Sequence, residues 1–293
     1  MGDAPHARAL WQVFEPYHAV VYFAPDVKSA FEDVGLPGFW RGYFASRAAP
    51  MGPVPAEVVI ATFYNFHPAM VRWAMSETWA RAAPAAVTAA RVRLADRTLR
   101  AWLGDEAIAS PDVAEAEGLA RRAAEQASPA GRPLFAGYAA LEWPAEPHLA
   151  LWHATTLLRE HRGDGHVSAL VSEQVDGCEA NVLTAAAGAS TGELQRASRQ
   201  WPDDEWGAAV DRLEQRDWIS ADTTLTPTGT AAKRRIEDLT DELAAPPLAA
   251  LEQSEQERLV VLLGRLSRRV LDAGGVTFPN PIGLPDLRAQ ADT

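Results

Sequence analysis

Glu15 and His18, near the start of the chain, have residue types and a spacing that suit acid–base chemistry. They are three residues apart, so on a helix their side chains share a face. A histidine titrates near neutral pH, and a carboxyl group beside it could give or take the same proton. The pair is therefore predicted to be catalytic. The alternative is a solvent-exposed stripe that also includes Tyr22.

Further polar residues are predicted to line a ligand pocket. The predicted ligand-binding residues are Tyr22, Arg47, His153, His161, Asp164 and His166. Arg47 follows the aromatic run at residues 39–44 and could bind an anion there. The alternative is a core helix whose arginine reaches solvent. For residues 161–166 the structural alternative is a corner between two helices, in which Gly163 ends one helix and Asp164 caps the next.

No cofactor is predicted, because the sequence lacks a phosphate-binding loop, a dinucleotide fingerprint and a nucleophile elbow. A metal is not predicted either. His153 and His161 are eight residues apart, about 12 Å along a helix, which is too far for them to share one ion. The minor alternative is a metal held by His161 and His166 together with Glu15 or His18.

The composition is that of an ordinary globular protein, and 293 residues suffice for one large or two medium-sized domains. The net charge of −12 makes nucleic acid a less expected partner, because phosphate backbones are bound by basic surfaces. No apolar run approaches the ~20 residues of a membrane span, and the N-terminus lacks the features of a secretion signal. We expect a cytoplasmic location and no membrane partner.

The elements that must position these residues follow from an internal repeat. An offset of roughly 140 residues aligns the first half of the chain with the second. The matching pairs include Leu10-Trp11 with Leu151-Trp152, Gly52 with Gly192, and Pro84 with Pro227. The predicted organisation is a first repeat at 8–140 with a degenerate wing, a proline-containing linker at 141–148, a second repeat at 149–283 and a tail at 284–293.

The second half is the easier to interpret. Helices are expected at about 149–161, 177–187, 190–199 and from 202 onward. A small hairpin is expected at 218–226. Pro227 then suits the first position of a long helix that ends near residue 243, and a last helix is expected at about 254–273.

This order of elements resembles the winged helix-turn-helix of the MarR family of bacterial regulators, on the stretches AAVDRLEQRDWI at 208–219 and LTPTG at 225–229. The chain is also similar to tandem helix-turn-helix proteins of unassigned function from high-GC bacteria. The resemblance implies a mainly α fold, a tandem duplication of a winged-helix-like unit with pseudo-twofold symmetry, and a small β-wing in the second copy. It also implies that the single chain corresponds to a fused dimer of the family, with a ligand cleft lined by the first helix of each copy. In solution the fused chain would be a monomer, or would dimerise once more.

The resemblance also implies recognition helices, but their sequences depart from the family. The candidate at 203–212 carries three acids in its first turn, which repel phosphate, and the wing at 220–224 has no lysine or arginine. The candidate at 68–75 is largely apolar. If the protein is a regulator, the DNA-binding residues are predicted to be Arg72, Arg196, Arg199 and Arg212.

The favoured interpretation is a small-molecule-binding protein of MarR-like ancestry that has largely lost DNA reading. It would hold an organic ligand between the repeats, and acid–base catalysis would be added if Glu15 and His18 act on that ligand. The alternative is a ligand-responsive MarR-type regulator that binds DNA. A scaffold that binds another protein through its acidic surface is a third interpretation.

Overall fold

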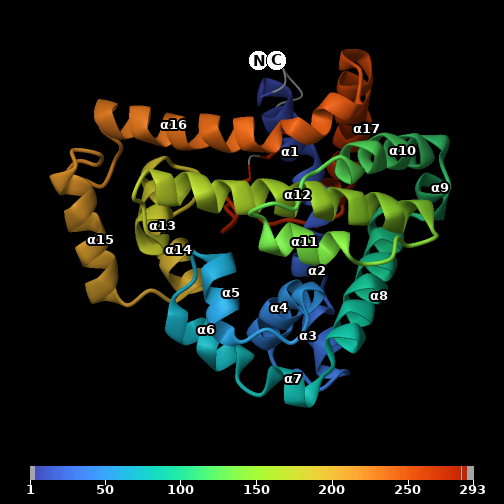
Figure 1. Ribbon diagram of the computed structural model, residues 1–293, viewed down its shortest axis with the longest axis horizontal. Coiled ribbons are helices and arrows are strands. Elements are labelled where there is room, and N and C mark those ends of the chain that lie inside the picture. Colours follow the sequence, from blue (N-terminus) through green and yellow to red (C-terminus); the bar gives the residue numbers. More distant parts are fainter. Residues whose placement is uncertain (1–3, 285, 289–293) are drawn as a thin grey trace.

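A computed structural model describes residues 4–284 and 286–288 and is mainly helical (Figure 1). Most of the predicted tail at 284–293 lies outside the described residues. The helices in chain order are α1 (Ala4–His18), α2 (Val20–Phe23), α3 (Val27–Glu32), α4 (Phe39–Ala48), the 3₁₀ helix η1 (Ala49–Met51), α5 (Ala56–Phe63), α6 (Pro68–Met75), α7 (Thr78–Arg81), α8 (Pro84–Leu103), α9 (Asp105–Ile108), α10 (Pro111–Glu125), α11 (Pro133–Ala139), α12 (Pro147–Ser172), α13 (Gly177–Ala186), α14 (Gly192–Arg199), α15 (Asp203–Gln215), α16 (Pro227–Ala244), the 3₁₀ helix η2 (Pro246–Ala250) and α17 (Gln253–Asp272).

Helix α12 crosses the middle of the molecule, and the other long helices pack around it (Figure 1). It contacts α1, α8, α10, α11 and α16, while α1 packs against α17 and α16. The first long helix of each half therefore packs on the last helix of the other half. One continuous hydrophobic core, with members from Leu10 to Val270, extends over both halves. A second, smaller cluster lies among the end of α12, α13, α15 and α16.

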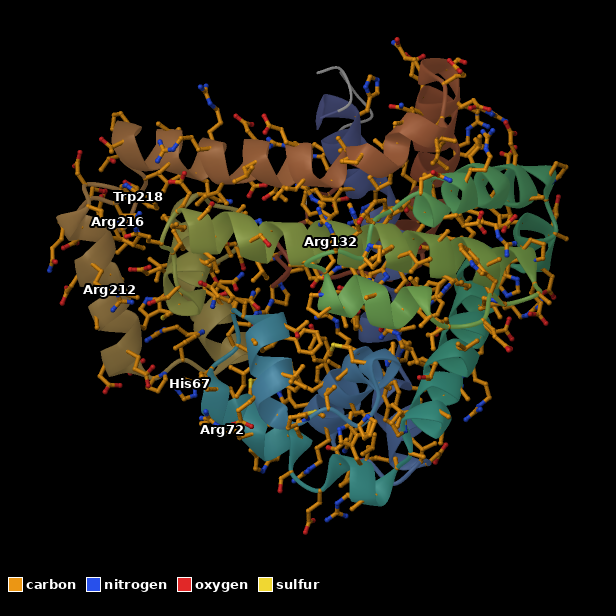
Figure 2. All side chains as sticks on the ribbon, in the orientation of Figure 1. His67, Arg72, Arg132, Arg212, Arg216 and Trp218 are labelled. Atoms are coloured by element: carbon orange, nitrogen blue, oxygen red, sulfur yellow. The ribbon has the colours of Figure 1, made fainter. Side chains whose placement is uncertain are left out.

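The continuity of α12 corrects the prediction for residues 161–166. The expected corner is wrong, because the helix runs through both Gly163 and Gly165 without a break. A Cβ at position 165 would lie 2.8 Å from Arg132 Nη1 and 3.2 Å from Leu243 Cβ. The side chain of Arg132 is fixed there by donating to the carbonyls of His161 and Leu243 (Figure 2). This glycine therefore serves close packing against α16, not helix termination.

Local signals placed most helix starts correctly. Pro68, Pro84 and Pro227 each open a helix, where a missing N–H leaves no hydrogen bond unmade. The cap of α14 differs by one residue from expectation: Thr191, and not Ser190, accepts from the backbone N–H of Leu194. The boundaries of α13, α16 and α17, and the start of α15, lie within one or two residues of the predicted ones.

The expected β-wing is reduced to a turn. A single antiparallel bridge joins Ile219 and Leu225, and no strand occurs within residues 4–284 and 286–288. The loop is closed by Ser220, which bonds the carbonyl of Thr224. Within the same described residues, no helix is long and apolar enough to cross a lipid bilayer.

Candidate functional site

A cavity of about 660 Å³, called the main cavity below, is lined by residues of both halves. Residues of α1, α4, α12, α14 and α16, together with the segment 281–283, contribute to its wall. Part of that wall is an aromatic cluster, whose members are Phe39, Trp40, Tyr43, Phe63 and Phe66. The rings of Phe39, Trp40, Tyr43 and Phe66 contact one another edge-on, tilted or stacked, and Phe63 is joined to them through the ring of Phe44. A cavity of this size and lining suits an organic molecule.

Arg47 and Glu160 form a buried ion pair in the cavity wall. One guanidinium nitrogen of Arg47 lies 3.0 Å from both carboxylate oxygens of Glu160, and Arg159 donates to the same carboxylate at 2.6 Å. Burial alone would raise the pKa of Glu160, but Arg159 and Arg47 together lower it. Glu160 is therefore an anion shared by two cations.

Arg199, on α14, lines the same cavity and forms no ion pair with a carboxylate among the described residues. Its side chain is buried, and its Nη2 donates to the carbonyl of Pro281 at 2.9 Å. Its Nε has no hydrogen-bond partner in the described part of the chain, and its guanidinium carbon lies 4.4 Å from the ring centroid of Phe66. Burial, reinforced by the nearby charges of Arg47 and Arg159, lowers the pKa of Arg199 to about 10. It remains charged at neutral pH.

Glu15 is the second carboxyl group of the cavity wall. Trp11 Nε1 donates to its Oε2 at 3.1 Å, whereas its Oε1 has no hydrogen-bond partner and lies 3.5 Å from Arg159 Nε. Burial raises the pKa of Glu15, and the Glu160 charge adds to this against the opposing effect of Arg159. Burial therefore disfavours the carboxylate form of Glu15, and the guanidinium of Arg159 offsets part of that cost.

The ion pairs around Arg47 leave one guanidinium group without a carboxylate. Glu160 pairs with Arg47 and Arg159, and Glu15 lies 3.5 Å from Arg159, whereas Arg199 forms no ion pair with a carboxylate in the described part of the chain. Asp164 is a third carboxyl group of the same wall, and burial raises its pKa to about 6. At the α16 end of the cavity, by contrast, the charges pair with each other, as Arg162 does with Asp241 and Lys233 with Glu237.

His18 lies behind the cavity wall and not in it. Its Nδ1 is 3.0 Å from Thr156 Oγ1, and because that hydroxyl donates to the carbonyl of Trp152, Nδ1 must carry the proton. Its Nε2 then accepts from the Tyr22 hydroxyl at 3.2 Å, and Tyr22 in turn accepts from Arg91 at 3.1 Å. Burial, together with nearby arginines, lowers the pKa of His18 well below its usual value. Both nitrogens are occupied, and no hydrogen bond joins His18 to Glu15.

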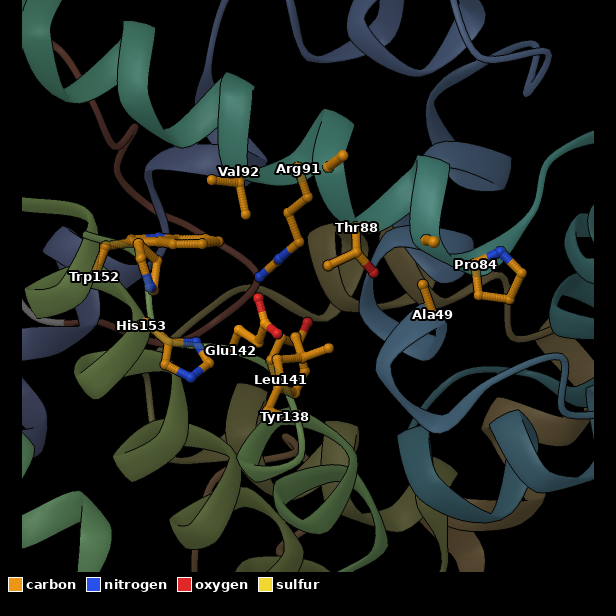
Figure 3. A pocket seen from close by; sticks show the side chains of 13 residues that line it. Ala49, Pro84, Thr88, Arg91, Val92, Tyr138, Leu141, Glu142, Trp152 and His153 are labelled. Atoms are coloured by element: carbon orange, nitrogen blue, oxygen red, sulfur yellow. The ribbon is translucent and has the colours of Figure 1, made fainter. Parts of the chain in front are cut away.

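The other predicted ligand residues separate into three places. Asp164 and His166 lie in the wall of the main cavity, as do Tyr22 and Arg47. Asp164 accepts from the first backbone N–H groups of α11 at 3.0 and 3.1 Å, so it caps a helix distant in sequence. His153 lines a different cavity (Figure 3), and His161 packs edge-on against Phe135 outside both.

The metal alternative gains no support from this arrangement. His166 Nδ1 bonds Thr240 Oγ1 at 2.9 Å, and burial lowers the pKa of His161 to about 3. Among residues 4–284 and 286–288, no three His, Cys, Asp or Glu side chains are close enough to hold one ion. Metal binding by His161 and His166 stays a minor alternative prediction.

The arginines predicted for DNA are engaged within the protein. Arg72 pairs with Glu57 at 3.0 Å, and Arg196 with Asp203. Arg212 (Figure 2) pairs with both Asp176 and Glu179 on α13. The fourth is the buried Arg199 of the main cavity.

The two candidate recognition helices meet at their N-terminal ends. His67, the N-cap of α6 (Figure 2), accepts from the backbone N–H of Ala69 at Nδ1, so its Nε2 carries the proton and donates to Glu205 Oε1, in the first turn of α15, at 3.1 Å. The backbone N–H of His67 also donates to the carbonyl of Arg199, and Trp201 Nε1 donates to the carbonyl of Asn65. The ends that would contact bases in a helix-turn-helix protein are therefore joined.

Comparison with known proteins adds one positive finding. The model of a helix-turn-helix family matches residues 7–277, nearly the whole chain. The protein belongs to this helix-turn-helix family. No curated protein and no solved structure matches it.

For this member of the helix-turn-helix family, the sequence analysis identified some residues of the main cavity wall but not the ion pairs that connect them. Arg47 was predicted as an anion clamp, but Arg159 and Glu160 were not singled out as its partners. Arg199 was assigned to DNA, because a helix sequence gives no signal of which basic residues are buried. The aromatic run at 39–44 was the available signal for the cavity wall.

Proposed function

We propose that this helix-turn-helix family member is a small-molecule-binding protein of MarR-like ancestry whose main cavity holds an organic anion. The observation that carries the proposal is the buried guanidinium of Arg199, which has no carboxylate partner among the described residues and lines the same cavity as Arg47 and Arg159. An uncompensated buried cation is costly, and an anionic ligand would relieve that cost. Guanidinium groups also match carboxylate, sulfonate and phosphate oxygens geometrically. The aromatic cluster would contact the apolar part of the ligand.

The chain is proposed to be a fused pair of winged-helix-like units. Reciprocal packing of α1 on α17 and of α12 on α10 supports this, because a twofold arrangement makes each such contact occur twice. The helices α1 and α12 also contact each other directly, as two elements beside a pseudo-twofold axis do. The cavity would then occupy the place between the repeats.

We also propose that the protein has largely lost sequence-specific DNA binding, because of where α6 and α15 lie. A palindromic site presents its two half-sites about 34 Å apart, so two reading helices must be separated accordingly. Here the N-terminal ends of these helices are held together by His67 and Glu205. The family description keeps a ligand-responsive DNA-binding regulator as the second candidate.

If the protein also catalyses a reaction on this ligand, Glu15 is a better candidate for the acid–base group than His18. Glu15 lies in the cavity wall and has a raised pKa, as a general acid would. His18 has no free nitrogen and would act only through Tyr22.

Two binding measurements on the full chain separate these functions. Fluorescence anisotropy with random and promoter-upstream duplexes at about 50 mM salt maximises the phosphate contribution to binding. We expect no binding there. A thermal-shift series with aromatic carboxylates and sulfonates is expected to raise the unfolding midpoint, whereas their neutral amides are not. Salt-sensitive DNA binding without any anion effect would instead favour the regulator.

A further inference from the structure

A second cavity lies between α8, the loop that follows α11, and the first half of α12 (Figure 3). Its volume is about 450 Å³, and it shares no lining residue with the main cavity. Most of its wall is apolar, with contributions from Ala85, Val92, Leu141 and Pro144. A cavity of this size accepts a small organic molecule and needs few polar groups to orient it.

Arg91 is a buried cation in this cavity. Its side chain comes from α8, and only 2% of the residue is exposed. Its one hydrogen bond among the described residues goes from Nη2 to the Tyr22 hydroxyl, and its Nε has no partner. No carboxylate forms an ion pair with it in the described part of the chain. The rings of Tyr22, Tyr138 and Trp152 lie 5.1, 5.9 and 5.3 Å from its guanidinium carbon. Aromatic faces offset part of the burial cost but fill none of the donor sites.

Two further polar groups face the same space. His153, on α12, is 4% exposed, and its Nε2 has no hydrogen-bond partner. Burial lowers the pKa of His153 to about 4, so it is neutral and can offer one N–H at neutral pH. Glu142, on the loop after α11, is exposed and lines the cavity. Figure 3 shows the side chains of Arg91, His153 and Glu142 pointing toward one another.

This set of groups combines a buried cation, an unpartnered imidazole and a more exposed carboxylate. A simple organic acid would satisfy the first two and be repelled by the third, whereas an amine would satisfy the third alone. We propose that the second cavity binds a small zwitterion of the amino-acid type. Its carboxylate would contact Arg91 and His153, its ammonium group would face Glu142, and its apolar side chain would pack on Val92 and Leu141. This site is independent of the function proposed for the main cavity.

Calorimetric titration of the full chain tests this with three matched probes. L-Leucine carries both charges, 4-methylpentanoate lacks the ammonium group, and 3-methylbutylamine lacks the carboxylate. We expect saturable binding of leucine, binding of the acid weaker by about five- to tenfold, and no binding of the amine. Absence of leucine binding, or equal binding of leucine and the acid, would overturn the proposal.

Substitutions in the second cavity test whether leucine binds there. Glu142→Gln, at an exposed position, should abolish the advantage of leucine over the acid. Arg91→Gln should weaken leucine binding by about thirtyfold or more, because it removes the buried partner of the carboxylate. Arg93→Gln, an exposed position on the same helix, is the matched control and should change nothing.

Two further variants keep the test decisive. If circular dichroism shows that Arg91→Gln fails to fold, Ala89→Trp replaces it, since this exposed residue lines the cavity and a bulky ring there would block it. Arg199→Gln shows whether leucine binds at the main cavity instead, because this substitution changes that cavity and not the second one. Leucine binding that persists in Ala89→Trp, or that is lost in Arg199→Gln, contradicts the assignment to this site.

Discussion

At the scale of single residues, removal of the charge of Glu160 and removal of the charge of Arg199, both buried in the main cavity wall, should have different effects on stability. Glu160→Gln leaves Arg47 and Arg159 without their shared anion, so we expect a loss of about 3–5 kcal/mol in the free energy of unfolding. Arg199→Gln removes a cation that has no carboxylate partner among the described residues, and the hydrogen bond to the carbonyl of Pro281 is lost with it. We expect the ligand-free protein to lose about 1 kcal/mol or less. Urea unfolding measures both variants, and an equal loss in the two would contradict the absence of a carboxylate partner for Arg199.

A second residue-scale prediction concerns pH. Burial lowers the pKa of His161 from 6.5 to about 3, so below pH 6.5 the unfolded chain takes up a proton that the folded chain does not. Stability from this group is therefore fully present above pH 6.5 and is lost as the pH falls toward 3. His161→Phe keeps a ring against Phe135 and removes the proton. Between pH 6 and 5 its unfolding free energy should fall less steeply than that of the wild type, by about 1.4 kcal/mol per pH unit. Equal slopes would contradict a neutral buried imidazole.

At the scale of elements, the two glycines inside α12 make a matched pair. Gly165→Ala places a Cβ 2.8 Å from Arg132 Nη1, which two carbonyls hold in position, so we expect a loss of about 1–3 kcal/mol. At Gly163 the nearest atom to such a Cβ is 3.5 Å away, an ordinary contact. Gly163→Ala should therefore stabilise the helix by up to about 1 kcal/mol. Chemical denaturation of both variants gives the comparison, and destabilisation by Gly163→Ala would indicate a break in α12 at that point.

The elements also show what the sequence could and could not predict. Starts at Pro68, Pro84 and Pro227 are set by a local backbone effect and were found. The interruption predicted at 163–165 was wrong, because glycine there serves contact with α16 rather than chain reversal. A sequence window does not reveal such a contact.

The same limit applies to the site. The pair Arg47–Glu160 joins residues 113 positions apart, so nothing local marks it. Arg199 was interpreted as a DNA contact because its burial depends on Pro281 and Phe66, which lie in distant segments. The aromatic run at 39–44 and Arg47 were recognised because they are adjacent in sequence.

At the scale of the whole molecule, each half needs the other. The packing of α1 on α17 and of α12 on α10 means that residues 1–140 or 141–293 expressed alone would expose the faces that form the shared core. We expect each half to aggregate or to self-associate, and the two to form a one-to-one complex when they are produced together. Sedimentation equilibrium of the separate and co-expressed halves measures this. A folded monomeric half would contradict the fused-pair architecture.

The joined ends of α6 and α15 place another constraint on the whole molecule. They leave the helix-turn-helix units as structural walls of the main cavity, with Gln195 and Arg199 of α14 donating to the carbonyl of Pro281. In this chain, residues of α13 and α14 therefore line the main cavity.

The proposed binding of an anion in the main cavity is tested by calorimetric titration of the wild type and of Arg199→Gln, each with an aromatic carboxylate and its neutral amide. We expect the wild type to bind the carboxylate and not the amide. Arg199→Gln should remain folded but bind the carboxylate about thirtyfold or more weakly, because a buried charge partner of the ligand has been removed. Equal affinity of the wild type for acid and amide, or equal affinity of both proteins for the acid, would contradict it.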